Sequence, residues 1–183
     1  MNPSPNLFLI GPMGAGKSSI GRRLAEHFAM PCLDLDAAVE ARTGTSVATI
    51  FEIEGEAGFR RRESDLLAEI SARSGIVLAT GGGAALAMEN RPLLRERGFV
   101  LWLQTSVEQQ LQRLVRDRQR PLLDAPDRRE RLEQLARVRD PVYRDLADLA
   151  VASVDESCQH AATRIATLLE RHWRRAPASK ATA

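Results

Sequence analysis

Short apolar runs alternate along this chain with amphipathic stretches, a pattern typical of a parallel sheet covered by helices. Leu7–Ile10 is a continuous apolar run that ends at a glycine, as expected for a strand buried on both faces. Four later runs predict further strands, at Cys32–Leu35, Ile76–Ala79, Phe99–Leu103 and Leu149–Ala152. Because helical patterns separate these runs, the sequence predicts an α/β fold of three layers, α/β/α, around a central parallel sheet of about five strands.

Apolar residues recur at helical spacing between the predicted strands. Ile20, Leu24 and Phe28 mark the first helix. Further helices are predicted around Ala57–Ser74, Arg91–Arg97 and Ser106–Arg118, through Leu132, Leu135 and Val138, and through Ile165 to Trp173. Thr105–Glu108 fits the capping box that opens an amphipathic helix.

The length and composition of the chain fit one packed domain. At 183 residues, with 44% hydrophobic and 27% charged residues, the chain can bury a sizeable core. We predict a single domain over residues 1–175 and a disordered tail over 176–183. Leu7–Ile10 is too short for a signal sequence or a membrane span, so we expect no membrane partner. Cys32 and Cys158 lack a CxxC partner, which favours a reduced, cytoplasmic compartment.

The positive charge of the chain is carried almost entirely by arginine. The formal net charge is +2, and Lys17 and Lys180 are the two lysines among 26 basic residues. Arginine binds carboxylates and phosphates with two parallel hydrogen bonds, which favours a small acidic or phosphorylated substrate. So modest a net charge argues against nucleic acid as a partner.

A glycine-rich segment follows the first predicted strand. Gly11–Ser18 fits GxxxxGK[ST] between a strand and a helix, the context of a phosphate-binding P-loop. Its backbone N–H groups face the phosphates, Lys17 reaches the β- and γ-phosphates, and Ser18 ligates Mg²⁺. The residues predicted to bind nucleotide are Gly14, Ala15, Gly16, Lys17, Ser18 and Ser19. A guanine-reading Asn-Lys-x-Asp motif needs a second lysine within the domain, so the sequence favours ATP.

Two carboxylates end the second predicted strand. Asp34 and Asp36 lie two residues apart at the carboxyl edge of the sheet, where ligands bind in open α/β folds. If one of them turns toward the glycine-rich segment it can hold a magnesium water, which leaves the other to meet a substrate hydroxyl. An acidic strand end or a helix cap is the alternative interpretation.

Four further elements are weak signals when taken singly. They are Phe59–Glu63 near the start of a helix, Thr80–Gly83 after a core strand, Arg120–Leu123 in an arginine-rich stretch, and Arg139–Tyr143. Glycines directly after a strand leave bare backbone that a small ligand can approach closely.

Taken in order with GPMGAGKSS and LDLD, these elements resemble the shikimate kinase family over residues 7 to about 152. The resemblance implies a P-loop kinase fold with a mobile lid at about 116–127. It also implies transfer of the γ-phosphoryl group of MgATP to the 3-hydroxyl of shikimate, giving shikimate 3-phosphate and ADP, a step in aromatic amino-acid synthesis through chorismate.

The resemblance also implies a role for each matching residue. Asp36, Lys17 and Arg120 would be catalytic, Arg120 being the lid arginine that closes over the phosphates. Ser18 and Asp34 would hold Mg²⁺. The substrate would be bound by Asp36, Arg60, Gly81, Gly82, Gly83 and Arg139, with Arg60 and Arg139 on its carboxylate. Because Arg61 and Arg62 flank Arg60, the choice among the three stays open. Ser153–Cys158 lacks the proline that often ends the adenine-contacting loop of the family, so the adenine contacts stay unassigned.

The sequence leaves two other classes of protein open. Another small-metabolite P-loop kinase, for gluconate or a nucleoside monophosphate, would share the loop and the sheet but would lack this acceptor set. A nucleotide-dependent regulatory module would hydrolyse or exchange ATP without consuming a small hydroxy acid. We expect a monomer.

Overall fold

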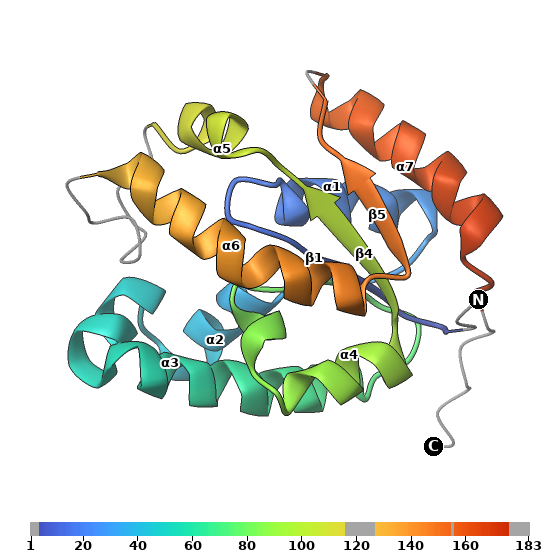
Figure 1. Ribbon diagram of the computed structural model, residues 1–183. Coiled ribbons are helices and arrows are strands. Elements are labelled where there is room, and N and C mark those ends of the chain that lie inside the picture. The colour runs from blue at the N-terminus through green and yellow to red at the C-terminus, as the bar shows by residue number, and fades with distance from the viewer. Residues whose placement is uncertain (1–3, 116–126, 155, 176–183) are drawn as a thin grey trace, which may run out of the picture.

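A five-stranded parallel sheet forms the centre of the molecule in the computed structural model, which describes residues 4–115, 127–154 and 156–175 (Figure 1). The strands lie in the order β2-β3-β1-β4-β5. Their bounds are β1 (Leu7–Ile10), β2 (Cys32–Asp34), β3 (Val77–Ala79), β4 (Phe99–Gln104) and β5 (Leu149–Ala152). Each neighbouring pair is parallel, which confirms the predicted fold class.

Helices cover both faces of this sheet. One face packs against α1 (Lys17–His27) and α7 (Cys158–His172). The other packs against α2 (Leu35–Thr43), α3 (Val47–Ser71), α4 (Asn90–Arg97) and α6 (Arg128–Leu146). The short α5 (Val107–Arg113) packs against α6, and the 3₁₀ turn η1 (Ala84–Leu86) follows the glycines after β3. The sheet thus lies between two helical layers (Figure 1).

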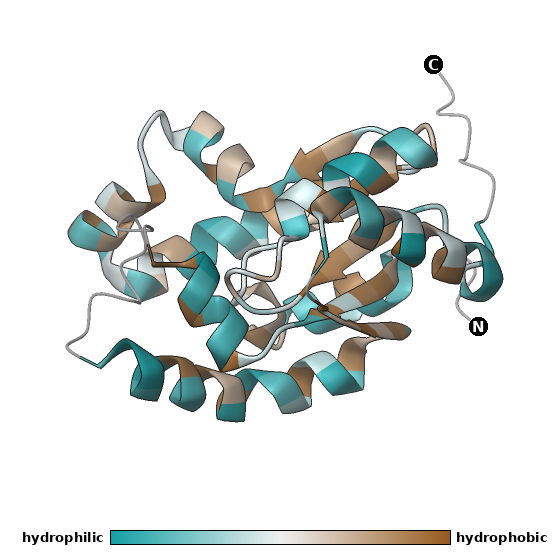
Figure 2. Ribbon diagram, turned by 90° about the horizontal axis from the view of Figure 1, so that it is seen from above, coloured by the Kyte–Doolittle hydropathy of each residue, from teal (hydrophilic) through white to brown (hydrophobic). Residues whose placement is uncertain are grey.

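The side chains of β1 alternate between the two cores. Phe8 and Ile10 point into the core shared with α2, α3 and α6, whereas Leu7 and Leu9 point into the core shared with α1 and α7. All four side chains are fully buried. Figure 2 shows the strands coloured mainly hydrophobic, while the helices around them carry both colours. The continuous apolar run of β1 is therefore the sequence signature of a strand covered on both sides.

A helix begins where the sequence predicted the end of the second strand. The strand stops at Asp34, whose Oδ1 accepts a hydrogen bond from the Ala37 N–H at 3.2 Å and caps α2. Asp36 lies in the first turn of that helix. The predicted strand end at Leu35 was therefore one residue late, and Asp36 lies on a helix rather than at a strand end, because the Asp34 side chain caps α2.

The third helix is longer than predicted and bent. It begins at Val47 with Ser46 as its N-cap, ten residues before the predicted start. Gly55 interrupts it with φ 68° and ψ −179°, a conformation that glycine adopts without steric cost. Arg62 pairs with Glu54 across this bend at 2.7 Å. The bend hid the first segment from a helical pattern, because it shifts the apolar face.

Two details of the later helices also differ from prediction. The capping box of α5 is formed by Ser106 and Gln109, one residue later than Thr105–Glu108. Val138, predicted on the apolar face of α6, is 63% exposed. The predicted lid at 116–127, except Asp127, and the predicted tail at 176–183 lie outside the described residues.

Candidate active site

The P-loop leaves the carboxyl end of β1 and opens α1. Gly14 and Gly16 have φ values of 76° and 84°, in the left-handed region that favours glycine. A Cβ at Gly11 would lie 2.5 Å from the Leu103 carbonyl oxygen, so only glycine fits there. Gly16 is the N-cap of α1 and offers no side-chain cap. The first N–H groups of the helix therefore point toward the loop, as in known phosphate sites.

Lys17 lies over the P-loop. Its Nζ donates hydrogen bonds to the carbonyl oxygens of Gly11 at 2.9 Å and Pro12 at 2.8 Å. These contacts hold the ammonium group above the concave side of the loop, where it adds positive charge to the N-terminus of α1. The position suits a cation that meets the outer phosphates of a bound nucleotide.

Ser18 and Asp34 meet between α1 and the end of β2. The Ser18 hydroxyl donates to Asp34 Oδ2 at 2.5 Å, while Asp34 Oδ1 caps α2. A hydroxyl and a carboxylate are the hard oxygen donors that suit Mg²⁺, which usually keeps several waters and binds substrate phosphates as well. This donor pair therefore fits a magnesium ion held between the loop and a nucleotide.

Asp36 faces the same hollow from the first turn of α2. It lines a pocket of about 220 Å³ between the P-loop and the glycines after β3. The other lining residues are Gly14, Gly16, Lys17, Ser18, Ser19, Asp34, Thr80 and Gly82. The pocket thus brings a carboxylate to the place where a phosphate bound in the P-loop would end, as needed for an acceptor hydroxyl.

Arg60 reaches the glycines after β3 from α3, with its guanidinium against Gly83. Its Nη1 donates to Glu63 Oε2 at 2.6 Å, and its Nη2 and Nε donate to Glu56 Oε1 at 3.1 and 3.3 Å. Burial alone would lower the pKa of Arg60, but the two glutamates raise it. Burial raises the pKa of the fully buried Glu63, and Arg60 opposes that shift. Arg60 is thus held charged and in one place.

Arg139 is a buried cation on α6 at the edge of the site. It is 3% exposed, and its Nε has no hydrogen-bond partner among the described residues. Desolvation lowers the pKa of Arg139, and no carboxylate forms an ion pair with it in the part of the chain that the structure describes. Burying an unpaired cation is costly, which makes Arg139 a candidate receptor for an anion.

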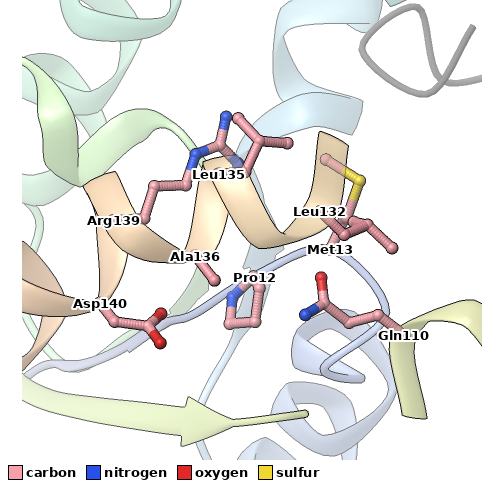
Figure 3. Close-up of a pocket in the computed structure, with 8 residues that line it drawn as sticks. All are labelled: Pro12, Met13, Gln110, Leu132, Leu135, Ala136, Arg139 and Asp140. Atoms are coloured by element: carbon pink, nitrogen blue, oxygen red, sulfur yellow. The ribbon is translucent and has the colours of Figure 1, made fainter. Parts of the chain in front are cut away.

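Arg139 and Asp140 also border a small cavity where α6 packs on the P-loop. In Figure 3 the two side chains leave the helix in different directions, with Pro12 between α6 and Gln110. The cavity has a volume of about 10 Å³, room for roughly one water molecule. Desolvation raises the pKa of Asp140. The cavity is too small for a substrate.

The glycines after β3 allow charged side chains to pack directly against the backbone. A Cβ at Gly81 would overlap the Glu63 carboxylate and lie 2.8 Å from Asp36 Oδ1. A Cβ at Gly83 would overlap the Arg60 guanidinium, and one at Gly82 would lie 3.3 Å from Arg139 Nη1. Glycine is therefore needed at Gly81 and Gly83, because the backbone itself packs against the charges.

The structure brings most of the predicted site residues to one hollow. Arg60 lies against Gly83, whereas Arg61 is exposed and Arg62 pairs with Glu54, so the arrangement favours Arg60 among the three. Arg120 lies outside the described residues, so its position stays a prediction.

Sequence reasoning gave no role to three residues that the fold brings to the site. Glu63 holds Arg60, and Tyr143 donates a hydrogen bond to the Gly82 carbonyl. Arg113 spans the P-loop, donating to the Gly14 carbonyl at 3.0 Å and to Ser153 Oγ at 2.8 Å. The contacts of Tyr143 and Arg113 are tertiary and leave no local pattern, whereas Glu63 and Arg60 lie three residues apart on one helix. The one available signal was the place of Glu63 and Tyr143 inside the two arginine motifs.

A P-loop that opens onto a carboxylate and two arginines defines a phosphotransferase, a P-loop kinase acting on a small molecule. The family model for shikimate kinase matches residues 13–170, and the chain belongs to the shikimate kinase family.

Known proteins support this assignment along nearly the whole chain. The shikimate kinase of Methylococcus capsulatus is 53% identical over 91% of this chain and 93% of its own length. That of Vibrio cholerae is 48% identical over 91% of this chain and 96% of its own length. The structure of shikimate kinase from Acinetobacter baumannii in complex with shikimate has a TM-score of 0.89 and 44% identity. It covers 92% of this chain and 94% of that chain.

Proposed function

We propose that this chain transfers the γ-phosphoryl group of MgATP to the 3-hydroxyl of shikimate, giving shikimate 3-phosphate and ADP. The observation that carries the proposal is the pair of arginines, Arg60 and Arg139, beside a carboxylate that faces the P-loop. A ring acid with a hydroxyl across from its carboxylate would span this arrangement. The kinship with shikimate kinases, one of them solved with shikimate bound, supports the same substrate.

The nucleotide would lie with its β- and γ-phosphates in the P-loop. The backbone of Gly14–Gly16 and the N-terminus of α1 would bind the β-phosphate, and Lys17 would leave its carbonyl contacts for the outer phosphates. Ser18 and Asp34 would hold Mg²⁺, which neutralises phosphate charge when bound. Ser19 follows in the first turn of α1 and lines the same pocket.

Arg60 and Arg139 would fix the substrate by its carboxylate. Asp36 would then accept the proton of the attacking hydroxyl as that oxygen bonds to the γ-phosphorus. The bond from the γ-phosphorus to the bridging oxygen breaks, and ADP takes its electron pair. A loose phosphoryl-transfer transition state needs positioning and balanced charge more than covalent help, and this residue set supplies both. Gly81, Gly82 and Gly83 would contact the ring.

Some parts of the proposal rest on the sequence alone. Arg120 would bring positive charge to the γ-phosphoryl group when a lid at about 116–127 closes, excluding water. We propose a cytoplasmic monomer that serves aromatic amino-acid synthesis and has no nucleic-acid partner. Among the described residues, no helix is long and apolar enough to cross a membrane.

The direct test is ADP release from MgATP with different acceptors. Release is measured with shikimate, with quinate or gluconate in its place, and with no acceptor. Strong release with shikimate alone is the expected result. Release with another acceptor would keep the kinase but discard shikimate, and release indifferent to any acceptor would mean an ATPase or a nucleotide switch.

A further inference from the structure

Tyr143, the one tyrosine of the chain, connects helix α6, which carries Arg139, to the glycines after β3. It lies on α6 one helical turn after Arg139 and is fully buried. Its hydroxyl donates a hydrogen bond to the carbonyl oxygen of Gly82, 61 residues away in the sequence. The ring packs against Trp102 with 5.9 Å between ring centroids, so the phenol enters the site from the core.

Arg139 lies beside the same hydroxyl. A Cβ on Gly82 would lie 3.3 Å from Arg139 Nη1, which places the guanidinium directly beside the glycine that Tyr143 binds. The Tyr143 hydroxyl and the Arg139 guanidinium also interact electrostatically, each favouring the charged form of the other. Three groups therefore meet at one point: a guanidinium, a hydroxyl and a backbone carbonyl.

We propose that Tyr143 is a positioning residue for the carboxylate of the acceptor, acting through Arg139 and the Gly82 carbonyl. The proposal rests on the proposed function, because it assumes that Arg139 receives the substrate carboxylate. Tyr143 itself touches no substrate atom. It fixes the position of the Arg139 guanidinium relative to the glycines after β3.

The chemistry of the three groups explains why a phenol suits this place. A guanidinium has only donors and a carbonyl has only acceptors, whereas a hydroxyl has one donor and two acceptor lone pairs. Tyr143 can therefore donate to Gly82 while turning a lone pair toward Arg139. Phenylalanine would fill the same space but leave the buried carbonyl without its partner and the arginine without an oxygen beside it.

The hydroxyl keeps its proton under ordinary conditions. Burial raises the pKa of Tyr143 to about 12, so the group remains a donor over the working pH range of a kinase. The positioning effect is therefore expected to be the same from neutral to moderately alkaline pH, and it introduces no new ionisation into the pH profile.

The test is Tyr143→Phe, which removes one oxygen and keeps the ring against Trp102. We expect the dissociation constant of shikimate and its KM to rise about tenfold, because Arg139 would no longer be fixed in its binding position before the substrate arrives. The KM for MgATP should stay within about twofold, because the hydroxyl bonds Gly82 rather than a residue of the P-loop. Binding is measured by calorimetry, and KM from ADP release.

The methyl ester of shikimate separates positioning from a general loss of structure. The ester has the same ring and hydroxyls but no negative charge for Arg139 to receive. Tyr143→Phe should weaken ester binding by about twofold or less, against about tenfold for shikimate. Trp102→Phe is the matched control, because Trp102 packs against the same ring and its indole N–H has no hydrogen-bond partner among the described residues, and it should weaken both ligands equally.

Three results would overturn the proposal. They are an unchanged shikimate KM in Tyr143→Phe, an equal loss for shikimate and its ester, and a parallel rise in the KM for MgATP. Failure of the proposed function is visible separately, because the unmodified protein would then release no ADP in response to shikimate. A thermal-unfolding curve for each variant, with one cooperative transition, shows that the comparison is made between folded proteins.

Discussion

The phosphate side of the site presents mainly backbone, whereas the acceptor side presents charged side chains. Gly11–Ser18 comes from one turn between β1 and α1, and Lys17 is its one basic residue. The acceptor side collects Asp36, Arg60 and Arg139 from three helices, α2, α3 and α6. In the proposed function, a nucleotide would thus be held by a local structure, while the acid would be held by residues that the packing of the whole fold brings together.

Because of this difference, substitutions on the two sides should differ in how far their effects extend through the structure. A change on the phosphate side alters one loop and one helix end. A change on the acceptor side alters a set of opposite charges that are mostly buried, in which Glu63 holds Arg60 and the backbone of Gly81–Gly83 packs on both. If the two sides are independent, acceptor-side variants should leave nucleotide binding intact.

The strongest test of that independence is Asp36→Asn. We expect kcat to fall about 10³-fold, within the range of general-base catalysis, because the amide cannot take the hydroxyl proton. The dissociation constant of ADP, measured by calorimetry, should stay within about twofold. Asp65→Asn, on the exposed surface of α3, is the control and should change neither value. Loss of ADP binding in Asp36→Asn would mean that the two sides are coupled.

Arg139→Ala tests the buried cation. We expect the KM for shikimate to rise about 100-fold, the usual effect of truncating one partner of a buried charge pair. The melting temperature should stay the same or rise, because Arg139 is buried without an ion pair among the described residues and desolvation lowers its pKa. Arg137→Ala, an exposed neighbour on α6, should alter neither quantity. A large drop in melting temperature would instead make Arg139 a structural residue.

Asp34 joins the two sides, and two substitutions separate its two roles. Asp34→Ala should raise the Mg²⁺ concentration needed for half-maximal rate about tenfold and destabilise the fold by about 1 kcal/mol, because it also removes the cap of α2. Asp34→Asn should raise the Mg²⁺ requirement similarly but keep the stability, since asparagine caps a helix as well as aspartate does. Magnesium titrations and thermal unfolding measure the two effects. An unchanged Mg²⁺ requirement in both variants would remove Asp34 from the metal site.

The same contrast explains how much could be predicted from the sequence. The P-loop is contiguous and its spacing is fixed by backbone geometry, so Gly14, Lys17 and Ser18 could be placed from the local pattern of residues alone. The strands of the sheet were also predicted, because each is a continuous apolar run.

The acceptor side could be assembled only through family resemblance. The start of α2 depends on one side-chain cap at Asp34, so the place of Asp36 on a helix could not be predicted from the apolar run of the strand. The contact between Tyr143 and Gly82 joins positions 61 residues apart, which no local pattern encodes. The bend at Gly55 likewise concealed the first part of α3. Arg120 and the lid stay predictions.

The smallest predicted effect comes from Glu56, which shares Arg60 with Glu63. Glu56 contacts the Nε and Nη2 edge of the guanidinium, the edge that a substrate carboxylate would need for two parallel hydrogen bonds. The side chain of Glu56 is 49% exposed and that of Glu63 is 1% exposed. The Glu56 carboxylate can therefore leave Arg60 and be solvated by water, whereas that of Glu63 cannot. We therefore expect substrate to replace Glu56 and leave Glu63 in place.

Glu56→Gln should then lower the KM for shikimate about two- to fivefold, because the Glu56 carboxylate would no longer compete with the substrate for Arg60. A factor of this size corresponds to the free energy of a partly exposed ion pair. The KM for MgATP should not change, and added salt should narrow the difference between the variant and the unmodified protein, because salt already weakens the competing pair. Glu52→Gln, exposed on the first segment of α3, is the control. A rise in the shikimate KM would mean that Glu56 holds Arg60 in its binding position, and the acceptor side would then depend on both glutamates.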